Sequence, residues 1–339
     1  MRDKQVPSGA RQRRNRGPDR DPKPATAKPF AAAPVIGPWP DGPFTVYLAA
    51  EGCQTDLSRE LGQDVAFSLD RLVIASGAPR AAAWAANVWL EPRRLSIVSI
   101  GDAVHQLKAV QRNWALLPAG HHRRAALIEA QLPKVSAKPL VFGQPAPAAP
   151  LGSWSLLAPD LVLASPRCSS PFRNGEAMFV EDKQGPPNRA YLKLWEAFTL
   201  LGVAPKPGQV CLDLGASPGG WSWVLQRLGA RVIAVDKAPL EPAIAALPGV
   251  TVRQQSAFAL EPAEVGRIDW LLSDVICYPE RLLRLVHRWL DAGFTGPCLC
   301  TLKFQAETDF ETIAAFAAIP GSRLMHLHNN KHELTWVRL

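Results

Sequence analysis

The stretch VCLDLGASPGGWSWVLQRLGARVIAVD, residues 210–236, decides the fold of this 339-residue chain. Its apolar start, Val210–Leu214, predicts a strand; its glycines predict a tight turn, and residues 221–228 predict a helix. Residues 231–235 predict a second strand, and Asp236 stands at its carboxyl end. A doubly wound sheet presents such a carboxylate to ribose hydroxyls. The stretch therefore predicts a nucleotide-binding β-α-β unit.

Two classes of ligand fit such a unit. The dinucleotide fingerprint is G-x-G-x-x-G, whereas residues 215–220 are GASPGG and lack the second glycine of that pattern, so NAD is disfavoured. Asp213 would place a negative charge beside the turn, which suits a cationic amino-acid ligand such as S-adenosylmethionine. A turn that merely joins a strand to a helix is the alternative, and the two acids and the later lysines make it less favoured.

A resemblance to a known family extends over about residues 170–339. The motif DLGASPGGW resembles the cofactor turn of the FtsJ-like ribose 2′-O-methyltransferases. Within that family the chain is most similar to the RlmM-type enzymes, which modify a cytidine ribose in large-subunit (23S) ribosomal RNA, because it also has a long N-terminal region and an SPF motif. The matching segments are SPF at 170–172, PNRAYLKLWEAF at 187–198, DLGASPGGW at 213–221, SDV at 273–275, TLKF at 301–304 and HELTWVRL at 332–339.

The resemblance implies an α/β fold, the Rossmann-like class I S-adenosylmethionine methyltransferase fold with a seven-stranded mixed sheet, preceded by a smaller α+β domain. It also implies that this smaller domain is a THUMP-like RNA-binding module. The expected parts are a disordered basic tail at 1–42, the α+β domain at 43–167, a linker at 168–188 and the catalytic domain at 189–339. The expected strands of the catalytic sheet are 210–214, 231–236, 250–253, 268–274, 297–303, 323–328 and 333–338, with a last hairpin around Asn329-Asn330.

Strands and helices alternate in the smaller domain as well. Its expected elements are strands at 44–50 and 95–100, apolar runs at 72–76 and 84–90, helices at 55–61, 103–116 and 123–132, and a closing hairpin at 154–165.

Methylating a ribose hydroxyl requires a neutral base or a fixed positive charge beside the oxygen, because the hydroxyl is a very weak acid. The resemblance implies a K-D-K-E tetrad for this task, at Lys193, Asp274, Lys303 and Glu333. Asp274 and Lys303 end adjacent predicted strands, so both should emerge at the edge that carries the cofactor turn. Lys303 is the candidate for handling the hydroxyl proton, and Glu333 is expected to hold the lysines in position. A solvated surface position is the ordinary alternative for a helical lysine such as Lys193.

For the cofactor, S-adenosylmethionine, the resemblance implies contacts from several positions, but the chain departs from the family at two of them. Ser256 stands where the family has an Asp for the adenine amino group, and Ala190 stands where Ser or Thr is common. A catalytically idle RNA-binding or ribosome assembly factor is therefore the alternative function. The implied cofactor contacts are Asp213, Gly215, Ser217, Pro218, Gly219, Gly220, Trp221, Asp236, Ser256 and Asp274.

The aromatic side chains near the turn have two interpretations, base stacking or core packing. Trp195, Trp221 and Trp223 could stack on bases, but a tryptophan in a helix that faces a sheet is more often core, and core is favoured for Trp223. No histidine or cysteine spacing predicts a metal site.

The net charge is +8, and residues 1–30 carry nine Lys or Arg against three Asp, which is +6 of it. Such a tail favours either an RNA-attracting arm or a solubilising leader. Six cysteines without paired spacing favour reduced thiols in the cytoplasm, and no stretch predicts a membrane span. The expected partner is ribosomal RNA, and a monomer is favoured.

Overall fold

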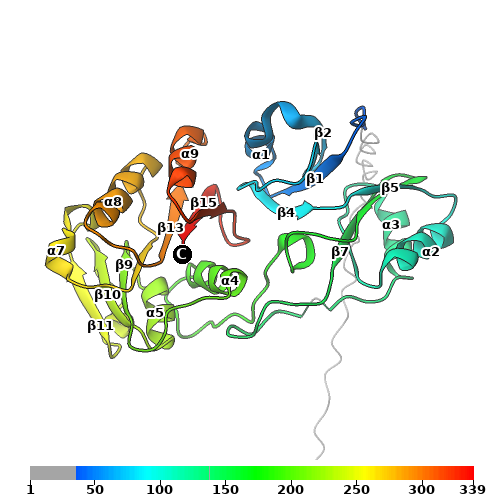
Figure 1. Cartoon of the computed structure of the whole chain (residues 1–339). Coiled ribbons are helices and arrows are strands. Elements are labelled where there is room, and N and C mark those ends of the chain that lie inside the picture. The colour runs from blue at the N-terminus through cyan, green and yellow to red at the C-terminus, as the bar shows by residue number, and fades with distance from the viewer. Residues whose placement is uncertain (1–35, 137) are drawn as a thin grey trace, which may run out of the picture. The chain divides into compact units, whose positions relative to one another are not determined.

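A computed structural model describes residues 36–136 and 138–339 (Figure 1). All of them belong to one compact unit. The expected basic tail, residues 1–42, lies almost entirely outside the described residues, so its disorder stays a prediction.

The second half of the chain builds a seven-stranded sheet in the order β11-β10-β9-β12-β13-β15-β14. Only β15 runs antiparallel to its neighbours, so the expected seven-stranded mixed sheet is confirmed. The strands are β9 (Val210–Leu214), β10 (Arg231–Asp236), β11 (Val250–Gln254), β12 (Trp270–Ser273), β13 (Cys298–Lys303), β14 (Ser322–Met325) and β15 (Glu333–Arg338). The helices are α4 (Tyr191–Leu201), α5 (Gly220–Arg227), α6 (Pro242–Ala245), α7 (Pro262–Val265), α8 (Pro279–Asp291) and α9 (Phe310–Ala318), with a 3₁₀ turn η3 at Ala257–Ala259.

Helices cover both faces of this sheet, as Figure 1 shows. Alternate strand residues point to opposite faces. Cys211 of β9 packs in one buried cluster with residues of α4 and α5, whereas Leu212 and Leu214 pack in another with residues of α8 and α9. Because both faces are buried, the strands are almost continuously apolar, and the charged residues lie mainly at strand ends.

The first half of the described chain contains two four-stranded sheets, in the orders β2-β3-β1-β4 and β5-β8-β7-β6. The predicted closing hairpin is confirmed as β7–β8. The strands are β1 (Phe44–Ala49), β2 (Val65–Leu69), β3 (Leu72–Ser76), β4 (Ala85–Trp89), β5 (Arg93–Ser96), β6 (Trp114–Leu116), β7 (Gly152–Ala158) and β8 (Leu161–Ser165). The helices are α1 (Gln54–Leu61), α2 (Ile100–Val110) and α3 (His122–Glu129), with 3₁₀ turns η1 (Gly62–Asp64) and η2 (Arg173–Gly175).

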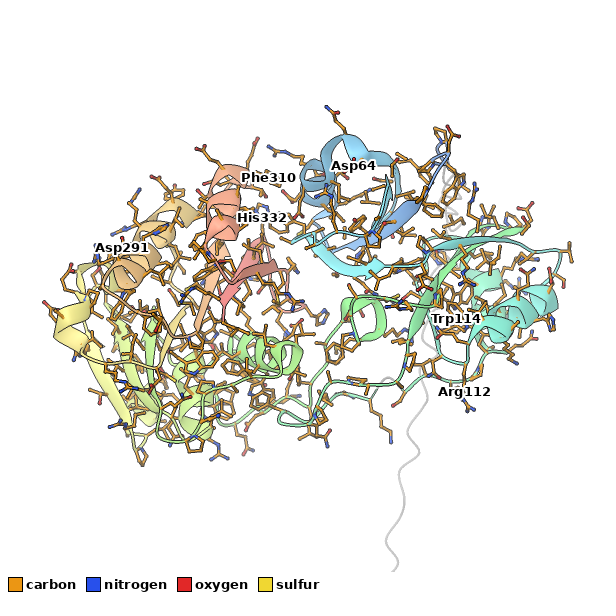
Figure 2. All side chains as sticks on the ribbon, viewed as in Figure 1. Asp64, Arg112, Trp114, Asp291, Phe310 and His332 are labelled. Carbon is orange, nitrogen blue, oxygen red and sulfur yellow. The ribbon has the colours of Figure 1, made fainter. Side chains whose placement is uncertain are left out.

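Two predictions for this half are wrong. The strand expected at 95–100 stops at Ser96, because Ser99 caps α2 and its side chain accepts a hydrogen bond from the Asp102 N–H. The helix expected at 103–116 ends at Val110, and the residues from Trp114 onward form β6, which pairs with β7. Figure 2 labels Trp114. In both places a local cap or a long-range strand pairing outweighs the apolar periodicity.

The segment expected as a linker, 168–188, is ordered against the second half of the chain. Phe172, Ala177 and Phe179 are buried in the same cluster as α4 and α5, and Phe179 bridges to Leu140. The segment is therefore part of a core, and the expected domain boundaries remain predictions.

Candidate active site

The glycine turn after β9 has a conformation that only glycine suits. Gly215 has φ 79° and Gly219 has φ 120°, both in the region that L side chains rarely adopt. A Cβ on Gly215 would lie 2.5 Å from the Cα of Val275, so the turn after β9 and the residue after Asp274 are in direct contact. The turn is thereby fixed beside the end of β12.

Asp236 holds this turn from the neighbouring strand. Its Oδ2 accepts from the Ser217 N–H at 3.1 Å, and its Oδ1 accepts from the Ala238 N–H at 2.9 Å. The Ser217 hydroxyl donates to the Pro239 carbonyl at 2.9 Å. Each carboxylate oxygen has two lone pairs, so Asp236 retains acceptor capacity toward a ligand.

Asp213 is completely buried under the turn. Its Oδ2 accepts from the Ser222 hydroxyl of α5 at 2.7 Å, whereas its Oδ1 is buried without a partner among the described groups. Burial, together with the nearby charges of Asp274 and Asp236, raises the pKa of Asp213 to about 7, while the hydrogen bond from Ser222 opposes the rise. Three carboxylates thus gather at the turn, which favours a cationic ligand.

The four residues predicted as catalytic meet at the same edge of the sheet. Lys193 comes from α4, Asp274 follows β12, Lys303 ends β13, and Glu333 begins β15. The Nζ of Lys303 lies 3.0 Å from Asp274 Oδ1 and donates to the Asp274 carbonyl at 2.5 Å. The Nζ of Lys193 lies 3.3 Å from the same Oδ1 and 2.5 Å from Glu333 Oε1. Asp274 is therefore the residue that joins both lysines.

Burial separates this cluster from ordinary surface ion pairs. The side chains of Lys193 and Glu333 are each 10% exposed, and those of Asp274 and Lys303 are 15% and 18% exposed. Buried charges need partners, and the two ammonium groups and two carboxylates supply them for one another. Lys193 is thus a buried residue and not the solvated surface lysine that was the alternative. Glu333 contacts Lys193 directly and faces Lys303 across the β13–β15 pair.

The remaining predicted residues have structural contacts of their own. The Trp221 ring is buried, and its Nε1 donates to the Ala190 carbonyl at 3.0 Å, which ties α5 to the start of α4. Ser256 caps η3, since its hydroxyl accepts from the Phe258 N–H. Trp195 and Trp223 are buried beside Tyr191, so the core interpretation holds for them. Pro218 and Gly220 complete the turn into α5.

One buried acid was not predicted from the sequence. Glu196, one turn after Lys193 on α4, is 2% exposed and accepts from the His328 N–H at 2.7 Å. Burial raises its pKa to about 7. A charged residue among the apolar residues of 191–201 was the only signal in the sequence. Glu196 anchors the loop before β15, and so supports the position of Glu333.

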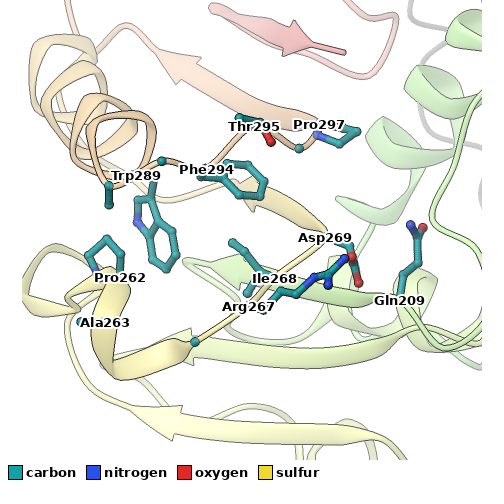
Figure 3. Close-up of a pocket in the computed structure, with 14 residues that line it drawn as sticks. Gln209, Pro262, Ala263, Arg267, Ile268, Asp269, Trp289, Phe294, Thr295 and Pro297 are labelled. Carbon is teal, nitrogen blue, oxygen red and sulfur yellow. The ribbon is translucent and has the colours of Figure 1, made fainter.

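A cavity of about 750 Å³ lies at the opposite edge of the sheet, where the parallel strands begin (Figure 3). Its lining includes Gln209, Asp269 and Pro297, each of which directly precedes a strand. Trp289 and Phe294 close its apolar side. It is therefore separate from the turn and the four charged residues.

No group of three or more His, Cys, Asp or Glu among residues 36–136 and 138–339 is arranged to hold a metal ion. Within the same ranges, every helix is too short or too polar to cross a membrane.

Sequence comparison finds a family match within this half of the chain. Residues 186–292 match the family described as FtsJ-like methyltransferase. These residues form an FtsJ-like methyltransferase domain. The domain match contains the glycine turn, Lys193 and Asp274, and the sheet around it is the class I methyltransferase fold that the resemblance implied. Lys303 and Glu333 lie beyond the matched residues.

Curated relatives of the FtsJ-like domain are named Ribosomal RNA large subunit methyltransferase M. The chain is 35% identical over 162 residues to the one from Alkalilimnicola ehrlichii, covering 44% of each protein. It is 36% identical over 157 residues to the one from Halorhodospira halophila, covering 44% of this chain and 46% of the relative. The chain thus matches less than half the length of these relatives. The solved structure of TrmN from Thermus thermophilus is 14% identical, covers 87% of this chain and 98% of its own, and has a TM-score of 0.37, too low for functional comparison.

Proposed function

We propose that this chain is an S-adenosylmethionine-dependent ribose 2′-O-methyltransferase that acts on large-subunit (23S) ribosomal RNA, at a cytidine. The observation that carries the proposal is the convergence of Lys193, Asp274, Lys303 and Glu333 beside the glycine turn. A hydroxyl that contacts Lys303 is then held next to a ligand bound at the turn. In-line transfer needs this proximity of the two reactants.

The residues at the turn fit S-adenosylmethionine, which carries a positive charge and supplies an electrophilic methyl group. The buried and unpartnered Oδ1 of Asp213 offers an acceptor to a cationic group. Asp236 is placed at the end of β10, where it can accept from ribose hydroxyls. Asp274 adds a third negative charge on the same side.

Lys303 is the residue that acts on the hydroxyl in this proposal. An ammonium has three donors, and Asp274 accepts from Lys303 through its carbonyl and its Oδ1. The third donor direction is left for the ribose oxygen, where positive charge stabilises the developing alkoxide. In its neutral form the same amine would accept the hydroxyl proton. Lys193 and Glu333 keep Asp274 in position from the other side.

Ribosomal RNA is proposed as substrate because the curated relatives carry that substrate in their names. The net charge of +8 agrees with a polyanionic partner. We place the reaction in the cytoplasm, as a monomer. All six cysteines are free, which agrees with a reducing compartment.

The test is methyl transfer from labelled S-adenosylmethionine to unmodified large-subunit ribosomal RNA transcript, with mass spectrometry to locate the modified ribose. The Lys303→Ala variant is the control for background transfer. Failure to bind the cofactor at sub-millimolar concentration would reject the proposal and favour the idle RNA-binding factor, for which the capping role of Ser256 is the structural argument. Tight saturable binding of NADH would point to an oxidoreductase.

A further inference from the structure

The loop that follows Asp274, residues 275–278, lies between the two parts of the proposed site. Val275 packs against the turn, since a Cβ on Gly215 would collide with its backbone. Cys277 is buried, which raises the pKa of its thiol to about 11, and the nearby charges of Arg281 and Lys303 oppose that rise. Alternate residues of this loop therefore face inward, one toward the turn and one toward the neighbourhood of Lys303.

The other two residues of the loop face outward. Ile276 is 78% exposed and Tyr278 is 66% exposed. They are the most exposed large hydrophobic side chains of residues 189–339. Exposed apolar groups on a protein surface are common singly, but two at alternate positions beside a reaction site indicate a contact surface.

The position of this pair limits what can cover it. Tyr278 is four residues after Asp274, and four residues of extended chain span at most about 14 Å. Asp274 binds the Lys303 ammonium with both its carbonyl and its Oδ1. An RNA acceptor whose reacting oxygen contacts Lys303 is therefore within reach of Ile276 and Tyr278 through the rest of its nucleotide.

Cationic groups frame the same loop. Arg281, in the first turn of α8, lies with its guanidinium 3.8 Å from the centre of the Phe258 ring. Lys303 lies at the inner side of the loop. An aromatic ring beside positive charge is the combination that binds single-stranded RNA, because bases stack on the ring and phosphates pair with the cations.

We propose that Ile276 and Tyr278 form the platform on which the base of the acceptor nucleotide stacks, with the phosphate of that nucleotide near Arg281. The proposal rests on the proposed ribose methylation, because that reaction places an RNA ribose at Lys303. It assigns the occupant of the surface to RNA and not to a partner protein. Stacking on a ring face recognises an unpaired nucleotide, so the platform requires a target that lies in a loop or is unstacked from a helix.

The test uses Tyr278→Ala, Tyr278→Phe and Ile276→Ala in the full chain. Removing a stacking side chain costs roughly 5- to 150-fold in affinity for RNA. We expect the KM for unmodified large-subunit ribosomal RNA transcript to rise by that order in Tyr278→Ala and by less in Ile276→Ala. Tyr278→Phe should retain most of the wild-type value, since the ring face remains. Val203→Ala is the matched control, since Val203 is 42% exposed in the loop before β9, at the opposite edge of the sheet.

Two further readouts separate this inference from the proposed function. The Kd for S-adenosylmethionine, measured by calorimetry, should be equal in all the proteins, and equilibrium binding of the transcript does not depend on turnover. Wild-type protein that transfers no methyl group would reject the proposed function, while the binding series would still test the platform. Transcript affinity within twofold of wild type in Tyr278→Ala, or equal weakening of cofactor binding, would overturn the platform.

Discussion

Lys303 has two possible roles, and its contacts leave room for either. Asp274 fixes the amine through two acceptors, so Lys303 can be a held positive charge or, once neutral, a base. We expect Lys303→Ala to abolish methyl transfer while cofactor binding is retained, because the turn does not depend on it. Lys303→Arg should also fail if a neutral base is needed, since guanidinium keeps its proton at neutral pH.

Single-turnover rates of wild type and both variants from roughly pH 6 to 10 will decide between these roles, because that range extends toward the usual lysine value of about 10.4. A flat wild-type profile with substantial rate in Lys303→Arg would reject the base. Full activity in Lys303→Ala would remove the residue from the reaction.

Asp213 should make cofactor binding depend on pH. Its pKa is raised to about 7, so the folded protein carries this carboxyl protonated at lower pH and ionised at higher pH. A cationic ligand favours the ionised form, and the affinity should therefore rise with pH through about 7, by up to about tenfold per pH unit below it. Calorimetric Kd values between roughly pH 5.5 and 8.5 would show this. The control is Asp213→Asn, because any titration of the ligand itself affects the Kd of both proteins equally. Identical dependence of Kd on pH in wild type and Asp213→Asn would contradict the role of Asp213.

At the scale of elements, Glu196 connects α4 with the loop before β15, but its burial disfavours the ionised carboxylate. Its pKa is raised from 4.5 to about 7, so its contribution to stability is fully present below about pH 4.5 and is lost as the pH rises to about 7. Because glutamine does not ionise, the Glu196→Gln variant does not lose this stability as the pH rises. We expect the Tm of the variant relative to wild type to increase from pH 4.5 to 7.5, by the equivalent of at most a few kcal/mol (about 1.4 kcal/mol per pKa unit).

The matched control for this change is Glu264→Gln, at an exposed carboxylate in α7. A Tm difference that does not vary with pH in Glu196→Gln would show that the pKa of the carboxyl is not raised in the folded protein.

The elements also show what the sequence could predict. The strands of the seven-stranded sheet were predictable because their apolar runs end in charged residues such as Asp236 and Lys303. The glycine turn also marks where β9 ends and α5 begins. The cap at Ser99 and the strand at Trp114 were missed, since a cap is a local hydrogen bond and β6 depends on a distant partner. Glu196, Ile276 and Tyr278 were missed for a similar reason. Neither the burial of an acid nor the exposure of an apolar residue is visible before the chain is folded.

At the scale of the whole molecule, the basic residues 1–30 carry +6 of the +8 net charge. The described residues begin after them, at residue 36. We expect deletion of residues 1–35 to leave the Tm unchanged and to weaken RNA binding with a smaller dependence on salt. Each RNA phosphate that the shortened protein no longer neutralises lowers the slope of log affinity against log salt by about 0.7 to 0.9. Equal slopes for the two proteins, from titrations at several salt concentrations, would favour a solubilising leader.

The register of β15 determines when the four-residue charged cluster is complete. Lys303 and Glu333 face each other across the β13–β15 pair, and β15 lies between β13 and β14. A slip of one residue would turn Glu333 to the other face of the sheet and separate it from Lys193. Of the seven strands, β15 is also the last to be synthesised. A nascent chain without β15 lacks the strand on which β14 pairs and the carboxylate that contacts Lys193. Insertion of β15 in its correct register is therefore the folding step that completes the four-residue charged cluster.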